Sequence, residues 1–106
     1  MDETIRKHIE NDIKNNKIVL YMKGTAEAPL CGFSAQTVNI LKTYNLPFKA
    51  INVLENEEIR QGIKEYADWP TIPQLYINGE FVGGCDIAVE LHQNGELAKM
   101  LGTTAK

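Results

Sequence analysis

The chain has 106 residues and a net charge of −3 with neutral histidines; 43% of its residues are hydrophobic and 24% are charged. These proportions are ordinary for a globular domain, so we expect one domain over residues 1–106 whose core needs no disulfide. The acidic balance gives no support for a general nucleic-acid-binding protein, and no apolar run reaches the roughly 20 residues that cross a membrane.

The first half of the chain predicts a helix, a strand, a loop, a second helix and a second strand. Isoleucines that recur every four residues indicate one buried face of the first helix. A short, unbroken apolar run is typical of a strand that is covered on both faces. The residues behind these predictions are Ile5, Ile9 and Ile13 for the first helix, which Asn15-Asn16 ends, 18–22 for the first strand, 24–29 for the loop, Ala35, Val38, Leu41 and Tyr44 for the second helix, and 48–53 for the second strand.

The second half predicts a third helix, a hairpin of two strands, a fourth helix and a short last helix. Asn56 is a suitable N-cap, and the acids after it suit the positive end of a helix dipole. Asn78-Gly79 is a strong hairpin signal. The residues behind these predictions are Ile59, Ile63 and Tyr66 for the third helix, 74–77 and 80–82 for the hairpin strands, Asp86 as the cap of a fourth helix through Leu91, and 96–101 for the last helix.

This order of elements predicts an α/β fold. A strand-helix-strand unit implies a parallel pair of strands with a right-handed crossover, whereas the hairpin must be antiparallel. We therefore expect a four-stranded mixed sheet flanked by helices.

The chain has two cysteines, Cys31 and Cys85, and whether they form a disulfide depends on the cellular compartment. The start of the chain, residues 1–4, is acidic and lacks the basic and apolar stretches of a secretory signal. We therefore expect a cytoplasmic protein, where thiols are kept reduced and a structural disulfide is disfavoured.

Cys31 is the candidate nucleophile, because Cys31-Gly32-Phe33-Ser34 lies in the turn between the first strand and the second helix. Backbone N–H groups and the dipole at a helix start stabilise a thiolate, so we expect a lowered thiol pKa. The alternative is an inert buried cysteine that packs as a small hydrophobe. Ser34 can cap the helix or bind the thiolate, but it cannot resolve a mixed disulfide. The site therefore needs an outside thiol, and glutathione fits that need.

The segment from Trp69 to Pro73 holds two prolines, which favour extended backbone and remove hydrogen-bond donors. We expect the backbone N–H and C=O of Ile72 to be open, so that a peptide ligand could pair with them as an extra strand. The alternative is a plain turn that leads into the strand.

Gly83-Gly84 precedes the predicted fourth helix, and glycine-rich backbone at a helix start is a natural anion site. Asp86 can cap this helix, bind a ligand amino group, or do both, whereas Cys85 is first interpreted as structural.

Three cations are candidates for binding an anion. Lys23 ends the first strand near Cys31, so it could lower the thiol pKa and receive a carboxylate. Arg60 and Lys64 share a face of the third helix. For Lys64 we favour a solvated surface position.

Four ordered motifs together resemble those of the CGFS-type monothiol glutaredoxins, in their single-domain branch. The match covers nearly the whole chain at matching spacing, and it implies a thioredoxin-like fold. The motifs are Lys23-Gly24-Thr25, Cys31-Gly32-Phe33-Ser34, Trp69-Pro70-Thr71-Ile72-Pro73-Gln74 and Gly83-Gly84-Cys85-Asp86.

The resemblance implies a glutathione site along these motifs. Lys23 and Arg60 would receive the glycine carboxylate, and Ile72 would pair with the cysteine part of glutathione beside a cis Pro73. The helix start at Cys85-Asp86 would hold the γ-glutamyl end.

The resemblance also implies a labile [2Fe-2S] cluster. Such a cluster usually takes four thiolate ligands, and each chain offers Cys31 alone at the groove. Two chains and two glutathione thiols would complete the set in a bridged homodimer that delivers clusters to apo client proteins. The family also pairs with BolA-type proteins, so a partner of that kind is expected too. Members are generally weak oxidoreductases at most.

Two other functions stay open at this point. One is glutathione-dependent disulfide exchange, in which Cys31 attacks a glutathionylated protein. The other is a redox sensor that forms a disulfide between Cys31 and Cys85.

Overall fold

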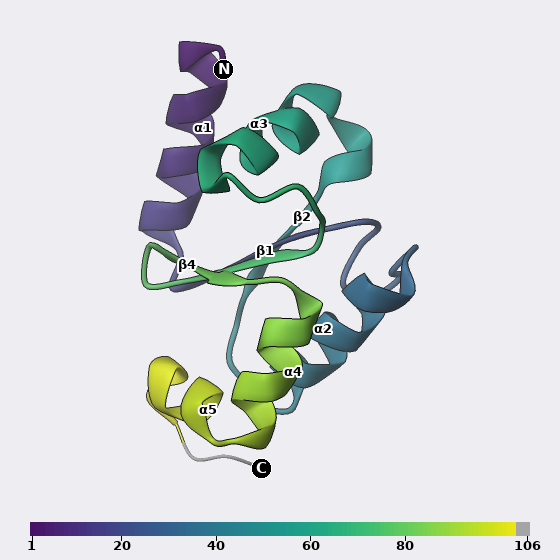
Figure 1. Cartoon of the computed structure of the whole chain (residues 1–106), viewed down its shortest axis with the longest axis vertical. Coiled ribbons are helices and arrows are strands. Elements are labelled where there is room, and N and C mark those ends of the chain that lie inside the picture. The colour runs from purple at the N-terminus through teal and green to yellow at the C-terminus, as the bar shows by residue number, and fades with distance from the viewer. Residues whose placement is uncertain (104–106) are drawn as a thin grey trace.

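The computed structural model describes residues 1–103 and places a sheet between two layers of helices (Figure 1). The order of elements agrees with the predicted one. The elements are α1 (Glu3–Asn15), β1 (Ile18–Met22), α2 (Gly32–Lys42), β2 (Lys49–Asn52), the short 3-10 helix η1 (Val53–Glu55), α3 (Glu57–Ala67), β3 (Gln74–Ile77), β4 (Glu80–Gly83), α4 (Cys85–Gln93) and α5 (Glu96–Leu101).

The sheet has the strand order β2-β1-β3-β4. β1 pairs with β2 in parallel and with β3 in antiparallel orientation, and β3 and β4 form the antiparallel hairpin. The predicted four-stranded mixed sheet is therefore confirmed. Within residues 1–103, no helix is both long and apolar enough to cross a membrane.

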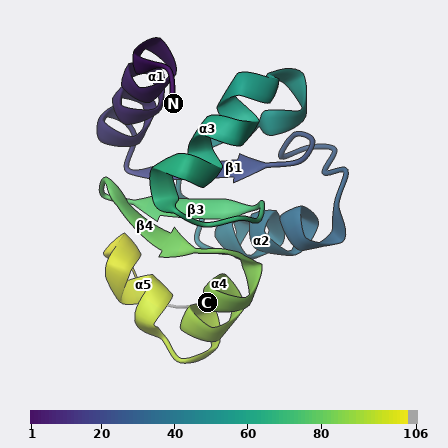
Figure 2. The ribbon, with the colours of Figure 1, turned by 45° about the horizontal axis from the view of Figure 1, so that its top comes forward.

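The central strand β1 divides the core into two halves, because successive side chains of a strand point to opposite faces. Val19 and Tyr21 pack in the half formed with α1 and α3. Leu20 and Met22 pack in the half formed with α2, α4 and α5. Figure 2 shows these two groups of helices on opposite sides of the sheet. All five residues of β1 are buried, as its unbroken apolar run predicts.

The start of α3 was predicted correctly, whereas the cap of α4 was not. Asn56 Oδ1 accepts hydrogen bonds from the backbone N–H groups of Glu58 and Ile59 at the start of α3. The N-cap of α4 is Gly84, and Asp86 is the second residue of that helix. A Cβ on Gly84 would lie 3.3 Å from the backbone oxygen of Pro73, so the close approach of these two segments favours glycine there.

Two other boundaries differ from the prediction. The second strand ends at Asn52 rather than at Val53, because Asn52 Oδ1 accepts from the N–H of Leu54 and turns the chain into η1. The second helix ends at Lys42, so Tyr44 lies beyond its predicted helical stripe, although its side chain is buried. In both cases tertiary packing buries an apolar residue, Val53 or Tyr44, outside the strand or helix that was predicted to contain it.

Candidate functional site

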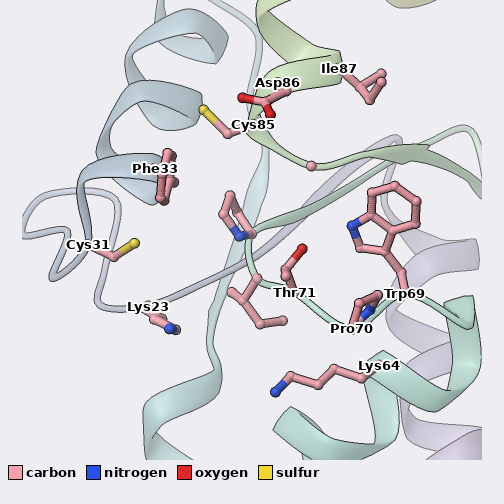
Figure 3. A pocket seen from close by; sticks show the side chains of 13 residues that line it. Lys23, Cys31, Phe33, Lys64, Trp69, Pro70, Thr71, Cys85, Asp86 and Ile87 are labelled. Atoms are coloured by element: carbon pink, nitrogen blue, oxygen red, sulfur yellow. The ribbon is translucent and has the colours of Figure 1, made fainter.

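A cavity of about 530 Å³ lies beyond the carboxyl end of β1, where the starts of α2 and α4 face the segment between α3 and β3 (Figure 3). The sequence-predicted residues Lys23, Cys31, Ile72, Cys85 and Asp86 all line it. Motifs that are far apart in the chain therefore meet in one place. The remaining lining residues are Phe33, Lys64, Trp69, Pro70, Thr71, Pro73, Gly84 and Ile87.

Cys31 is the N-cap residue of α2 and is partly exposed. Its sulfur points into the cavity (Figure 3). A hydrogen bond from the backbone N–H of Ser34 is the largest cause that lowers the pKa of the Cys31 thiol, and the N–H of Phe33, the Ser34 hydroxyl and the charge of Lys23 act in the same direction. Partial burial opposes them, but the pKa falls below its ordinary value. The prediction of a lowered thiol pKa is thus confirmed.

Ser34 is fully buried beneath the thiol. Its Oγ accepts a hydrogen bond from the backbone N–H of Lys23 at 3.1 Å. Its hydroxyl also helps to lower the pKa of Cys31. Of the two roles considered for Ser34, the structure supports binding the thiolate, and the same side chain ties the end of β1 to the start of α2.

The lowered pKa predicts how Cys31 reacts with pH. In a Cys85→Ala background, we expect the alkylation rate by iodoacetamide to reach half its maximum below the free-thiol pKa of about 8.5. Adding Ser34→Ala should raise this midpoint without abolishing the shift, because the backbone N–H groups remain. Because folding lowers the pKa of the Cys31 thiol, the thiolate stabilises the folded state at a pH above the pKa that this thiol has in the unfolded chain. This stabilisation is lost as the pH falls through the lower pKa of the folded state. A midpoint at or above the free value would contradict the prediction.

The opposite end of the cavity carries the start of α4. Asp86 is exposed, and its carboxylate lies at the cavity rim in Figure 3. Cys85 is buried, and its thiol donates a hydrogen bond to Gln36 Oε1 at 3.3 Å. Neither cysteine forms a disulfide in this structure.

The segment between α3 and β3 forms one wall of the cavity. The Ile72–Pro73 peptide bond is cis, as the resemblance implies. Within residues 1–103, no hydrogen bond occupies the backbone N–H or C=O of Ile72. These two groups are therefore open to an extended ligand that lies in the cavity.

The cations do not all lie where the sequence placed them. Lys23 and Lys64 both line the cavity, and Figure 3 shows both at its lower edge, opposite Asp86. Lys64 thus lines the cavity, although the sequence favoured only a solvated surface position for it. Lys64 lies one turn nearer than Arg60 to the end of α3, from which the chain enters the cavity wall. Arg60 is not a lining residue, and its Nη1 lies 3.9 Å from Glu57 Oε2, so its role in ligand binding stays a prediction.

Two aromatic side chains at the cavity were not singled out as site residues. Phe33 is 62% exposed beside the thiol, and Trp69 packs its ring against Phe81 with centroids 5.5 Å apart. An aromatic residue directly within the nucleophile motif is a signal that could have identified Phe33, because large exposed apolar side chains often mark contact surfaces.

The cavity thus has cations at one end, a carboxylate at the other, and a thiol and open backbone groups between them. This arrangement suits a short extended peptide with a carboxylate at one end and an amino group at the other. No cluster of three or more His, Cys, Asp or Glu side chains suited to a metal ion occurs within residues 1–103.

Comparison with known proteins gives consistent results. Residues 18–82 match the family model described as Glutaredoxin. A probable monothiol glutaredoxin 2 of Rickettsia felis is 63% identical over 88% of this chain and 89% of its own length. The solution structure of reduced poplar apo GrxS14 is 52% identical, with a TM-score of 0.82 over 92% of this chain and 90% of that one.

A more distant structure shows how far the fold extends. The crystal structure of a buckwheat glutaredoxin-glutathione complex is 20% identical and has a TM-score of 0.83 over 96% of this chain and 94% of that one. The chain therefore has the thioredoxin-like fold of glutaredoxins.

Proposed function

Because this chain belongs to the glutaredoxin family, among its monothiol members, we propose that it binds glutathione beside Cys31 and carries a [2Fe-2S] cluster between two subunits. The single observation that carries the proposal is the accessible Cys31 thiol, with its lowered pKa, in a groove that carries charges of opposite sign at its two ends.

Glutathione matches this groove in charge. Its glycine carboxylate would lie near Lys23 and Lys64, with Arg60 as a predicted further contact, and its cysteine part would pair with the open backbone of Ile72. Its γ-glutamyl amino group would face Asp86. The γ-glutamyl carboxylate would meet the N–H groups at the start of α4, where the helix dipole favours anions. The buckwheat protein, which shares this fold, has been crystallised with glutathione.

The supply of thiols supports a shared cluster. A [2Fe-2S] cluster usually takes four thiolates. Both cysteines line the cavity, but only the Cys31 thiol is partly exposed, because the Cys85 thiol is buried and donates a hydrogen bond to Gln36 Oε1. Two chains and two glutathione molecules would therefore complete the ligand set. Because the glutathione thiols can exchange, an apo client protein or a BolA-type partner could replace them, which suits a carrier.

Anaerobic reconstitution tests this function. With ferrous iron, sulfide and glutathione, we expect a brown protein with visible absorption and the mass of a dimer. Omitting glutathione should leave the protein colourless and monomeric, because half the expected ligands are then missing. A Cys85→Ala variant is the matched control, and it should still assemble the cluster. A colourless monomer under complete conditions, or full assembly without glutathione, would overturn the cluster proposal.

Glutathione-dependent disulfide exchange is the second candidate, favoured by the partly exposed, low-pKa thiol. The Cys31 thiolate would attack the glutathionyl sulfur of a mixed disulfide, and the client thiolate would leave. A second glutathione thiolate would then attack the Cys31 mixed disulfide, which releases Cys31 and oxidised glutathione. Steady-state reduction of a glutathione mixed disulfide tests this role. A rate no greater than that of Cys31→Ser would eliminate it.

A further inference from the structure

The amide of Gln74 lies directly behind the cavity wall. Gln74 is the first residue of β3, and its side chain is fully buried. Its Nε2 donates hydrogen bonds to the backbone oxygens of Trp69 at 3.1 Å and Thr71 at 3.2 Å. One buried amide therefore holds both ends of the three-residue segment 69–71, and all three of these residues line the cavity.

Tyr76 completes the bonding of this amide. Its hydroxyl donates to Gln74 Oε1 at 3.1 Å, and its side chain is 2% exposed. Residues two apart in a strand point to the same face, which is why Gln74 and Tyr76 can meet. Burial, with a smaller contribution from Tyr66, raises the pKa of Tyr76, so its hydroxyl remains a donor at neutral pH.

The directions of these bonds fix the orientation of the Gln74 amide. Backbone oxygens only accept, so the amide nitrogen must face Trp69 and Thr71. The amide oxygen then faces the Tyr76 hydroxyl, and both amide N–H groups have partners. A buried, fully satisfied polar network of this kind is directional and rigid, because unpaired alternatives are costly in a low-dielectric interior.

We propose that Gln74 and Tyr76 act as positioning residues, which hold residues 69–72 in the conformation that receives the ligand. The bonds to Trp69 and Thr71 lie on the inner side of this segment, and the open backbone of Ile72 follows directly. Neither Gln74 nor Tyr76 lines the cavity, so both act through the segment that does. This inference rests on the proposed binding of glutathione.

Glutathione affinity, measured by calorimetry, tests the inference with matched variants. Tyr76→Phe removes one hydrogen bond to the amide, and Gln74→Met removes all three. A typical hydrogen bond changes an equilibrium by roughly twofold to tenfold, so we expect about a threefold weaker affinity for Tyr76→Phe and at least about tenfold for Gln74→Met.

Tyr21→Phe is the matched control. The Tyr21 ring is fully buried and packs edge-to-face against Tyr76, with ring centroids 5.8 Å apart. Within residues 1–103, however, its hydroxyl has no hydrogen-bond partner. Tyr21→Phe should therefore leave glutathione affinity unchanged.

Two further readouts separate positioning from general damage. The pH midpoint of Cys31 alkylation should stay unchanged in every variant, because the groups that lower its pKa are Ser34, Phe33 and Lys23. Trp69 is the single tryptophan and lies in the held segment, so its emission maximum without ligand should shift in Gln74→Met. It should not shift in Tyr21→Phe.

Several results would overturn the inference. Wild-type affinity in both Tyr76→Phe and Gln74→Met would do so, as would an equal loss in Tyr21→Phe or a shifted Cys31 midpoint in the weakened variants. If Gln74→Met does not fold, the glutathione affinity of Tyr76→Phe compared with that of Tyr21→Phe still tests the inference. If the wild-type protein itself binds no glutathione, the proposed function fails first and the positioning role fails with it.

Discussion

Replacing Cys31 by serine should abolish cluster assembly and mixed-disulfide formation while the fold is retained. The serine hydroxyl does not ionise at neutral pH, so it supplies neither a nucleophile nor a thiolate ligand. The Cys31 side chain is partly exposed and belongs to neither core cluster, and a serine hydroxyl can accept from the same backbone N–H groups, so the fold should be retained. We expect thiol exchange to fall on the order of a thousandfold or more, as is usual when a nucleophile is removed.

The measurement combines three readings on one preparation of Cys31→Ser. After reconstitution, the visible spectrum should be flat, the native mass should be that of a monomer, and incubation with oxidised glutathione should add no glutathione to position 31. Thermal unfolding should remain close to that of the wild type. Cys85→Ala is the control for the loss of a thiol in general. It should still form the coloured cluster, the dimer and the mixed disulfide at Cys31. A coloured dimer of Cys31→Ser would show that another ligand holds the cluster.

Reversing the charge of both cavity lysines should nearly eliminate glutathione binding. Lys23→Glu combined with Lys64→Glu turns the cationic end of the cavity into an anionic one. A hydrogen bond to a charged group contributes about 1.5–3 kcal/mol, so we expect affinity to fall on the order of a hundredfold or more. Calorimetry at two salt concentrations measures it. The wild-type affinity should fall with added salt, because charge attraction is screened.

The controls for this charge reversal separate local from global effects. Lys7→Glu with Lys14→Glu changes the net charge equally, but on α1, and should leave affinity close to the wild-type value. Lys64→Glu alone should weaken binding without moving the Cys31 midpoint, whereas Lys23→Glu should also raise it, since Lys23 lowers that pKa. Arg60→Gln tests the contact that the resemblance implies. Equal affinity of the double lysine variant and the wild type would exclude the proposed carboxylate site.

Local signals in the sequence were enough to predict the elements and the thiol with a lowered pKa. The apolar run of β1, the cap at Asn56 and the hairpin at Asn78-Gly79 depend on neighbours in the chain, and all three predictions are confirmed. The lowered pKa of Cys31 is local too, because Ser34 and Phe33 supply its main hydrogen bonds from within the same motif.

Contacts between distant segments decided the rest. Arg60 and Lys64 share one face of α3, and periodicity cannot say which of them reaches the cavity until α3 is packed beside Trp69. The N-cap of α4 is Gly84 rather than Asp86, and glycine is favoured at that position because the backbone oxygen of Pro73 lies close to it.

The buried amide of Gln74 is the clearest example of a feature that depends on contacts between distant segments rather than on local sequence. A glutamine that begins a strand has no partner that sequence spacing can name. Only the folded chain brings the carbonyls of Trp69 and Thr71 to one side of its amide and the hydroxyl of Tyr76 to the other. The sequence by itself determined where the elements lie and which thiol has a lowered pKa, because those depend on short-range periodicity and on groups at a helix start. The tertiary structure alone decided which cation of α3 lines the cavity and which groups bond to Gln74, because those depend on the packing of segments far apart in the chain.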